Sequence, residues 1–141
     1  MWEMRRWILP LLLAGALLAV YFLSVTGVYG APQHHRLNGA QHAFSVAFAQ
    51  LIMFAQDLGY TVSIGRCHDP NGVRGSLHKI RLACDLHLFR DGHYLSGTED
   101  YRHLGAWWIR YGHNYGIPLE WGGHNGRGDG NHFSHGWKGR W

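Results

Sequence analysis

An alternation of apolar and polar residues between positions 80 and 88 constrains the fold more than any other stretch of this sequence. Every second residue in it is apolar: Ile80, Leu82, Cys84, Leu86 and Leu88. Successive side chains of a strand point to opposite faces, so Asp85 and His87 would lie together on the other face. The pattern predicts a strand with one face on a core and the other on a cleft, with His78 in the loop that leads into it.

A glycine-rich segment near the C-terminus, residues 121–134, carries a second polar cluster. It contains His132 and, three residues earlier, Asp129. A catalytic zinc ion takes three protein ligands and keeps a fourth position open for water. His78, Asp85 and His132 would make a set of two histidines and one carboxylate, with Asp129 beside it.

These segments resemble the zinc D-Ala-D-Ala carboxypeptidase and L-alanyl-D-glutamate endopeptidase family, and within it the small phage-endolysin branch. The matching residues run in order between about residues 60 and 134: Ser76, His78, Leu82, Ala83, Asp85, Leu88, Phe89, Asp91, Gly92, Leu104, Gly105, Trp108, Trp121, Gly122, Gly123, Asp129, Gly130, Asn131, His132 and Phe133. The resemblance implies an α+β fold with a small antiparallel sheet and packed helices, as in hedgehog-type relatives, and a zinc peptidase domain over residues 39–141.

The resemblance also implies roles for individual residues. His78, Asp85 and His132 would hold one Zn²⁺, and Asp129 would be the general base, with Glu120 as a weaker rival. Relatives that act as D,D-carboxypeptidases often have Glu at the position of Asp129, so the Asp favours the endopeptidase branch.

Arg66 would grip a substrate carbonyl or carboxylate, although the tyrosine that usually precedes it in the family is missing from Ser63-Ile64-Gly65-Arg66. Three further residues are expected around the site. Ser76 would orient His78 by a hydrogen bond, His87 would lie beside the ligands, and Trp121 would lie near the substrate. His124 and His135 are expected to be exposed to solvent.

Residues 7–23 form an uninterrupted apolar run of 17 residues, preceded by Arg5 and Arg6. A membrane-spanning helix needs about 17–25 such residues, and the arginines would hold the N-terminus in the cytoplasm. We therefore expect residues 1–30 to be a membrane anchor, with the rest of the chain on the periplasmic or extracytoplasmic side. The alternative is a signal peptide cut before Ala31 and a secreted protein, although such a peptide usually has an apolar core of only about 7–15 residues.

The remaining segments predict the elements around the site. Residues 31–38 would form a linker, and helices are expected at residues 39–58, capped by Asn38, and from Ser96 or Thr98 to about Tyr111. Further strands are expected at residues 60–66, at 93–95 after a turn at Asp91 and Gly92, and at 119–122.

The two cysteines are too far apart in sequence for a C-x-x-C motif, so a cysteine-type zinc site is not expected. If Arg66 and Asp85 face the cleft from neighbouring strands, Cys67 and Cys84 both face the opposite side. They would then form a disulfide in an oxidising compartment or remain two buried thiols.

The formal net charge is +4, and without residues 1–30 it is 11 minus 8, or +3. A mildly basic surface suits an anionic polymer but is also ordinary for a soluble domain. We expect a monomer without a nucleic-acid partner. The role of the Trp-rich tail, residues 136–141, stays open.

These expectations converge on zinc-dependent hydrolysis of a peptidoglycan stem-peptide bond, between L-Ala and D-Glu, in cell-wall lysis or remodelling. A D-Ala-D-Ala carboxypeptidase is the alternative enzyme. A non-catalytic zinc module that binds the wall is the alternative of another class, and a membrane protein whose apolar helix is the active part is a third possibility.

Overall fold

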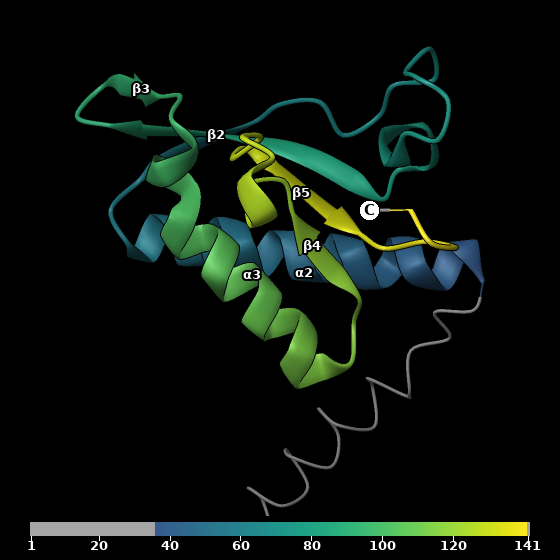
Figure 1. Cartoon of the computed structure of the whole chain (residues 1–141). Coiled ribbons are helices and arrows are strands. Elements are labelled where there is room, and N and C mark those ends of the chain that lie inside the picture. Colours follow the sequence, from purple (N-terminus) through teal and green to yellow (C-terminus); the bar gives the residue numbers. More distant parts are fainter. Residues whose placement is uncertain (1–35, 141) are drawn as a thin grey trace, which may run out of the picture. The chain divides into compact units, whose positions relative to one another are not determined.

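The computed structural model describes residues 36–140, and its helices and strands form an α+β arrangement. The α-helices are α2 (Leu37–Asp57) and α3 (Arg102–Tyr115) (Figure 1). The strands are β1 (Thr61–Ile64), β2 (Ala83–Arg90), β3 (His93–Leu95), β4 (Leu119–Trp121) and β5 (His132–His135). Short 3-10 helices are η1 (Leu77–Ile80), η2 (Thr98–Tyr101) and η3 (His124–Gly126). The predicted α+β class, with a small antiparallel sheet and packed helices, is confirmed for the described residues.

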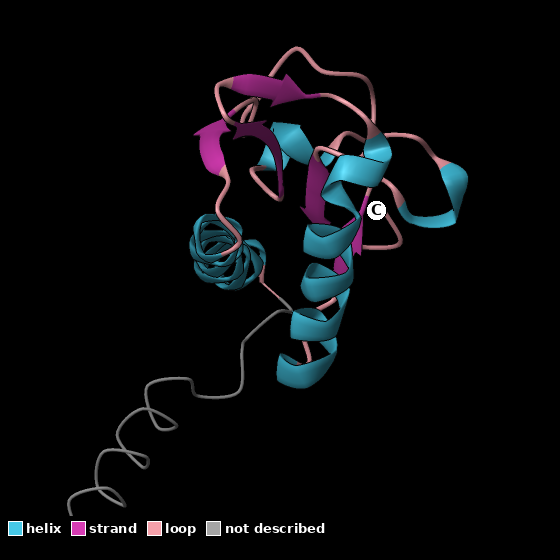
Figure 2. Ribbon diagram, turned by 90° about the vertical axis from the view of Figure 1, so that its left-hand side faces the viewer, coloured by secondary structure: helices cyan, strands magenta, loops and turns pink. Residues whose placement is uncertain are grey.

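The sheet has the strand order β1-β2-β5-β4, with β3 pairing β2, and all its pairings are antiparallel. Figure 2 shows the strands in magenta and the helices in cyan. Strand β2 is therefore central, between β1 on one side and β5 on the other. Ser63 pairs with His87, and Asp85 pairs with His132. This topology brings residues 78, 85 and 132 to one place, because β5, which lies near the C-terminal end of the chain, pairs with β2 in the middle of the sheet.

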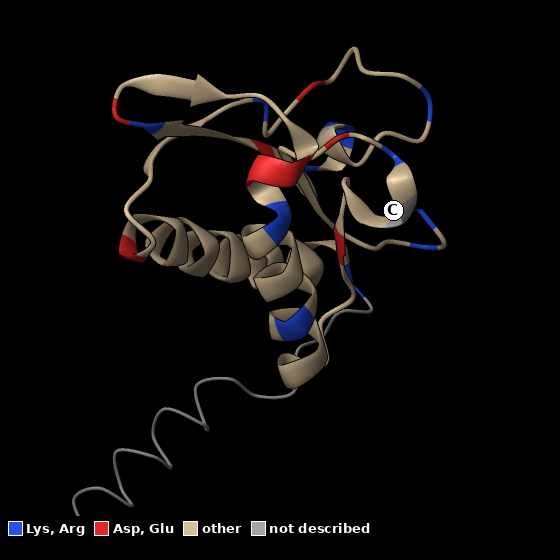
Figure 3. Ribbon diagram, turned by 60° about the vertical axis from the view of Figure 1, so that its left-hand side comes forward, with Lys and Arg blue, Asp and Glu red and all other residues tan. Residues whose placement is uncertain are grey.

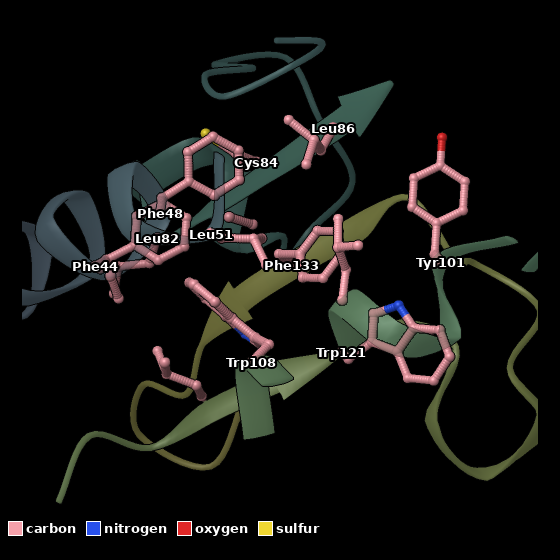
Figure 4. Packing of buried hydrophobic residues seen from close by; sticks show 14 of the residues in the cluster. Phe44, Phe48, Leu51, Leu82, Cys84, Leu86, Tyr101, Trp108, Trp121 and Phe133 are labelled. Carbon is pink, nitrogen blue, oxygen red and sulfur yellow. The ribbon is translucent and has the colours of Figure 1, made fainter. Parts of the chain in front are cut away.

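The core lies between the helices and one face of the sheet, as the close-up of the buried side chains shows (Figure 4). Leu82, Leu86 and Leu88 are fully buried, as their alternation predicts. Trp108 of α3 is also fully buried and makes edge-to-face contacts with Phe44 of α2 and Phe133 of β5. Burying one large side chain in this way contributes about 1.5–3 kcal/mol, so this face of the sheet is committed to packing. The polar side chains that could form a functional site lie on the opposite face of the sheet.

Several predicted boundaries are wrong by a few residues. Strand β2 begins at Ala83, not at Ile80, because residues 77–80 form the 3-10 turn η1 and Arg81 leaves it with a left-handed φ of 54°. Helix α2 begins at Leu37, so the predicted linker ends earlier, and Asn38 lies inside the helix and does not cap it.

The second predicted helix also starts and ends differently. Neither Ser96 nor Thr98 caps it, because the Asp100 carboxylate accepts the Gly97 N–H at 2.9 Å and η2 forms first. Helix α3 then runs to Tyr115, beyond the expected end at Tyr111, and Gly116 terminates it in a left-handed conformation with φ 64°.

No helix within residues 36–140 is long and apolar enough to cross a bilayer. The anchor predicted at residues 7–23, the alternative signal cut before Ala31, and most of the linker lie outside the described residues.

Cys67 and Cys84 form a disulfide, which decides between the two alternatives left open by the sequence. It closes a loop with a sequence separation of 17 that contains η1, and Cys84 is the neighbour of Asp85. The bond therefore ties the segment carrying His78 to the strand carrying Asp85.

We expect the double variant Cys67→Ala/Cys84→Ala to lose about 3 kcal/mol of unfolding free energy, because a cross-link over about 15 residues removes that much freedom from the unfolded chain. Urea denaturation of the full-length protein with and without dithiothreitol measures this loss. The reductant should shift the wild-type midpoint and leave that of the double variant in place. An unchanged wild-type midpoint would contradict the prediction.

Candidate metal centre

Three side chains that are far apart in sequence meet on the polar face of the sheet. Asp85 of β2 lies directly opposite His132 of β5, and His78 comes from η1. Asp85 Oδ1 and His132 Nδ1 are 3.2 Å apart, His132 Nδ1 and His78 Nε2 are 3.2 Å apart, and His78 Nε2 and Asp85 Oδ1 are 3.5 Å apart. All three side chains are largely buried, with 12–23% of each exposed. This set is the one group of metal-binding side chains found among the described residues.

The triangle of donor atoms fits a small divalent ion. Two ligand atoms at about 2.0–2.1 Å from a tetrahedral metal ion lie about 3.3–3.4 Å from each other, which matches the three observed separations. Two imidazoles and one carboxylate also suit zinc and neighbouring transition metals better than calcium or magnesium, which prefer oxygen ligands. One metal ion can therefore be held here without moving the backbone, and the donor set alone does not select zinc.

Backbone hydrogen bonds fix the main chain at Asp85 and His78, the two candidate ligands whose segments the disulfide ties together. The Asp85 carbonyl accepts the Gly65 N–H at 2.8 Å, and the Asp85 N–H donates to the Arg66 carbonyl at 3.0 Å. The His78 carbonyl accepts the N–H groups of Asp69 and Arg81 at 3.3 Å each. These two candidate ligands therefore lie on a strand of the sheet and on a turn that the disulfide ties to it. Their main chain needs little further ordering when a metal ion binds.

The Asp85 carboxyl is held in its ionised form. Burial by itself would raise the pKa of Asp85, but hydrogen bonds and favourable charge interactions with His132 and His78 outweigh it and hold the pKa well below its usual range. A permanently ionised carboxylate is the form that binds a cation. The Asp85 carboxylate could therefore bind a cation at any pH near neutrality.

Asp129 lies in a pocket of about 240 Å³ together with His132, and we call it the Asp129 pocket. Its other walls are formed by Glu120, Trp121, Gly122, Arg127 and Ser134. Two features hold the loop of Asp129. Its N–H donates to the Gly122 carbonyl at 3.3 Å, and a Cβ added to Gly122 would lie 2.3 Å from the Asp129 carbonyl oxygen. The lack of a side chain at Gly122 therefore permits this close approach of the two backbone segments.

Trp121 packs beside the loop of Asp129 and donates a hydrogen bond to it. Its ring is packed between two glycines, since an added Cβ would lie 2.2 Å from it at both Gly105 and Gly123. Its indole N–H donates to the Gly130 carbonyl at 2.7 Å. Trp121 is 9% exposed and lines the Asp129 pocket, so it both braces the loop and borders the place where a substrate would lie.

The structure does not gather the other predicted site residues with the three ligands. The Arg66 guanidinium lies 3.3 Å from Asp69 Oδ2 and is 63% exposed, so the role of Arg66 in catalysis stays a prediction. His87 shares the face of Asp85, but its ring stands edge-on to Tyr94 and covers Gly65.

Two other expectations about polar side chains can be compared with the structure. Ser76 does not orient His78 through Nδ1, because this buried atom has no hydrogen-bond partner in the described part of the chain. His124 is exposed as expected. The prediction for His135 is wrong: His135 is 1% exposed, because it alternates inward with Phe133 along β5. Its Nδ1 lies 2.7 Å from the Gly136 carbonyl oxygen, and burial lowers its pKa.

Sequence reasoning missed Arg127, which lines the Asp129 pocket. A signal was present in the sequence, because Arg127 lies only two residues before Asp129. The pocket therefore offers an arginine close to Asp129 and His132.

Comparison with known proteins finds no family model and no curated protein that matches this chain.

Proposed function

We propose that this protein is a zinc-dependent peptidase that hydrolyses a bond of the peptidoglycan stem peptide, of the L-Ala to D-Glu endopeptidase type. The observation that carries the proposal is the convergence of His78, Asp85 and His132 to within 3.2–3.5 Å, in a site whose pocket also contains Asp129. The motif resemblance supplies the substrate class.

In this proposal the three convergent side chains hold the ion through His78 Nε2, Asp85 Oδ1 and His132 Nδ1. When bound, zinc would supply Lewis acidity, lowering the pKa of a coordinated water to about 7 and polarising a carbonyl. The chain's own residues would do the rest. The Asp129 carboxylate takes a proton from the attacking water and delivers it to the amine nitrogen that leaves when the C–N bond breaks.

Arg127, and Arg66 if its pairing with Asp69 opens, would place a guanidinium against negative charge on the carbonyl oxygen or against a substrate carboxylate. Glu120 lines the same pocket and remains the second candidate for the base. Its carboxylate lies 3.8 Å from His124 Nδ1, whereas no ion pair engages Asp129 among the described residues, and this difference favours Asp129.

We further propose that residues 7–23 anchor the chain in the membrane as a single pass, with the peptidase domain periplasmic or extracytoplasmic and the protein acting as a monomer on wall. The Cys67–Cys84 disulfide supports an oxidising compartment, because such bonds persist mainly outside the cytosol.

The test is digestion of purified peptidoglycan by the full-length, zinc-loaded protein in detergent, followed by mass spectrometry of the products. We expect new N-terminal D-glutamate on released stem peptides, and chelation should stop the release. Free D-alanine would instead identify a D,D-carboxypeptidase. A folded, zinc-loaded protein that binds the wall but releases nothing would overturn the hydrolase in favour of a binding module.

A further inference from the structure

A second pocket, of about 460 Å³, lies beside α3, and we call it the α3 pocket. Its floor consists of Gly105, Ile109 and Trp121, which are buried or half-buried. Its volume falls in the range of about 300–1,000 Å³ that is usual for small-molecule sites, which combine an apolar lining with a few polar groups. Four of the lining residues have polar side chains: Arg102, Arg110, His113 and His124.

The formally charged residues of α3 are all positive. The helix contains no Asp or Glu, and the two arginines, eight residues apart, lie about 12 Å apart along its axis (Figure 3). Arg102 is engaged by Glu99, with Nε and Oε2 2.6 Å apart. Arg110 forms no ion pair with any residue of the described part of the chain and is exposed. No described residue that lines the pocket is an Asp or Glu, and Arg110 is the lining arginine that no carboxylate of the described part of the chain engages, so it can pair with an anion.

The α3 pocket adjoins the candidate metal centre. Trp121 lines both pockets. His124 of the α3 pocket also lies 3.8 Å from Glu120 of the Asp129 pocket. An extended ligand whose reacting bond lies at Asp129 and His132 would therefore pass over Trp121 to reach the cations of α3.

We propose that the α3 pocket binds an acidic segment of the peptide substrate, with Arg110 as the group that contacts its carboxylate and the floor at Ile109 and Trp121 as the apolar contact. This inference rests on the proposed function, because it takes the stem peptide as the ligand. It adds a specificity element: stem peptides with free carboxylates bind better than the same peptides with those groups amidated. Arg110 is a binding residue in this proposal and takes no part in the chemical step.

The test is calorimetric titration of the full-length, zinc-loaded protein with D-glutamyl-L-lysyl-D-alanine and with the same peptide fully amidated. Arg110→Gln removes the charge, Arg110→Lys keeps it, and Arg36→Gln makes the same charge change at an exposed residue outside both pockets. We expect the wild type and Arg36→Gln to prefer the free acid. Arg110→Gln should bind the acid about fivefold more weakly, as expected for one exposed ion pair, and the preference should shrink as salt is raised. Arg110→Lys should keep most of the preference for the free acid.

Equal affinity for the acid and the amide, or equal losses in Arg110→Gln and Arg36→Gln, would overturn the assignment. The result for the α3 pocket can be distinguished from the result for the proposed hydrolase. Binding that depends on Arg110 without cleavage of the wall supports the pocket and removes the proposed enzyme. Cleavage of the wall with an Arg110→Gln variant that binds the acid normally removes the pocket and leaves the enzyme.

Discussion

Asp129→Asn should slow hydrolysis of peptidoglycan by about 10²–10⁴-fold, the usual contribution of a general acid or base, while the protein still binds one equivalent of zinc. The substitution keeps the shape of the side chain and removes the group that accepts a proton. Asp129 is exposed in its pocket, and its loop is held by the Gly122 carbonyl and the Trp121 indole through backbone atoms only. The variant should therefore fold normally, and its loss should appear in kcat for a soluble stem peptide more than in KM.

Asp91→Asn is the matched control, because Asp91 is an exposed aspartate in the turn between β2 and β3 and lines neither pocket. It should retain wild-type rates. Zinc content is read by atomic absorption on the same samples. If Asp129→Asn keeps more than half of the activity, the base is a different group, and Glu120→Gln becomes the variant to measure. If it is inactive because it has lost zinc, Asp129 acts on the metal site and not on the proton.

The core face of β2 was predictable because apolar residues at every second position have few other ways to be buried. The same alternation placed Asp85 on the polar face. The position of His78 depended on a different cause. Residues 77–80 form a 3-10 turn because Leu77 is buried and Arg81 adopts a left-handed conformation, and neither follows from period-two spacing.

The arrangement around Asp129 was predictable only in part. The contact of Gly123 with Trp121 is local in sequence, but Gly105, the other glycine that packs against the Trp121 ring, is on another element 16 residues before Trp121. A glycine inside a helix usually costs about 1 kcal/mol relative to alanine, so its presence in α3 hinted at a packing constraint without naming Trp121. His135 was misjudged for a related reason: a histidine near a ligand was taken as solvated, whereas its strand turns it into the core.

His132→Ala should weaken zinc binding by more than about 100-fold, since even the loss of a residue that only hydrogen-bonds to a ligand costs about 10–100-fold. His132 Nδ1 is the atom nearest to both other donors, at 3.2 Å from each, so its removal leaves two ligands 3.5 Å apart with no third. The fold should survive, because His132 lies on the polar face of β5 and the core residues beside it, such as Phe133, point the other way. Zinc titration of chelator-treated protein, followed by competition with a chromophoric chelator, measures the affinity.

His87→Ala is the control, since His87 is a histidine on the same face two residues from Asp85 but outside the triad. Zinc at about 1,000 times its dissociation constant for the wild type should stabilise the wild type and this control by about 4 kcal/mol, through binding to the folded state alone. At the same zinc concentration His132→Ala should gain no more than about 1.4 kcal/mol, because its affinity is weaker by about 100-fold or more. A wild type that takes up no zinc, or a His132→Ala variant that takes it up with normal affinity, would remove the metal centre. The proposed zinc peptidase would fall with it, whereas binding at the α3 pocket is tested separately through Arg110. If His132→Ala instead loses zinc and activity while Asp129→Asn loses only activity, the two residues hold separate roles: His132 places the ion, and Asp129 moves the proton.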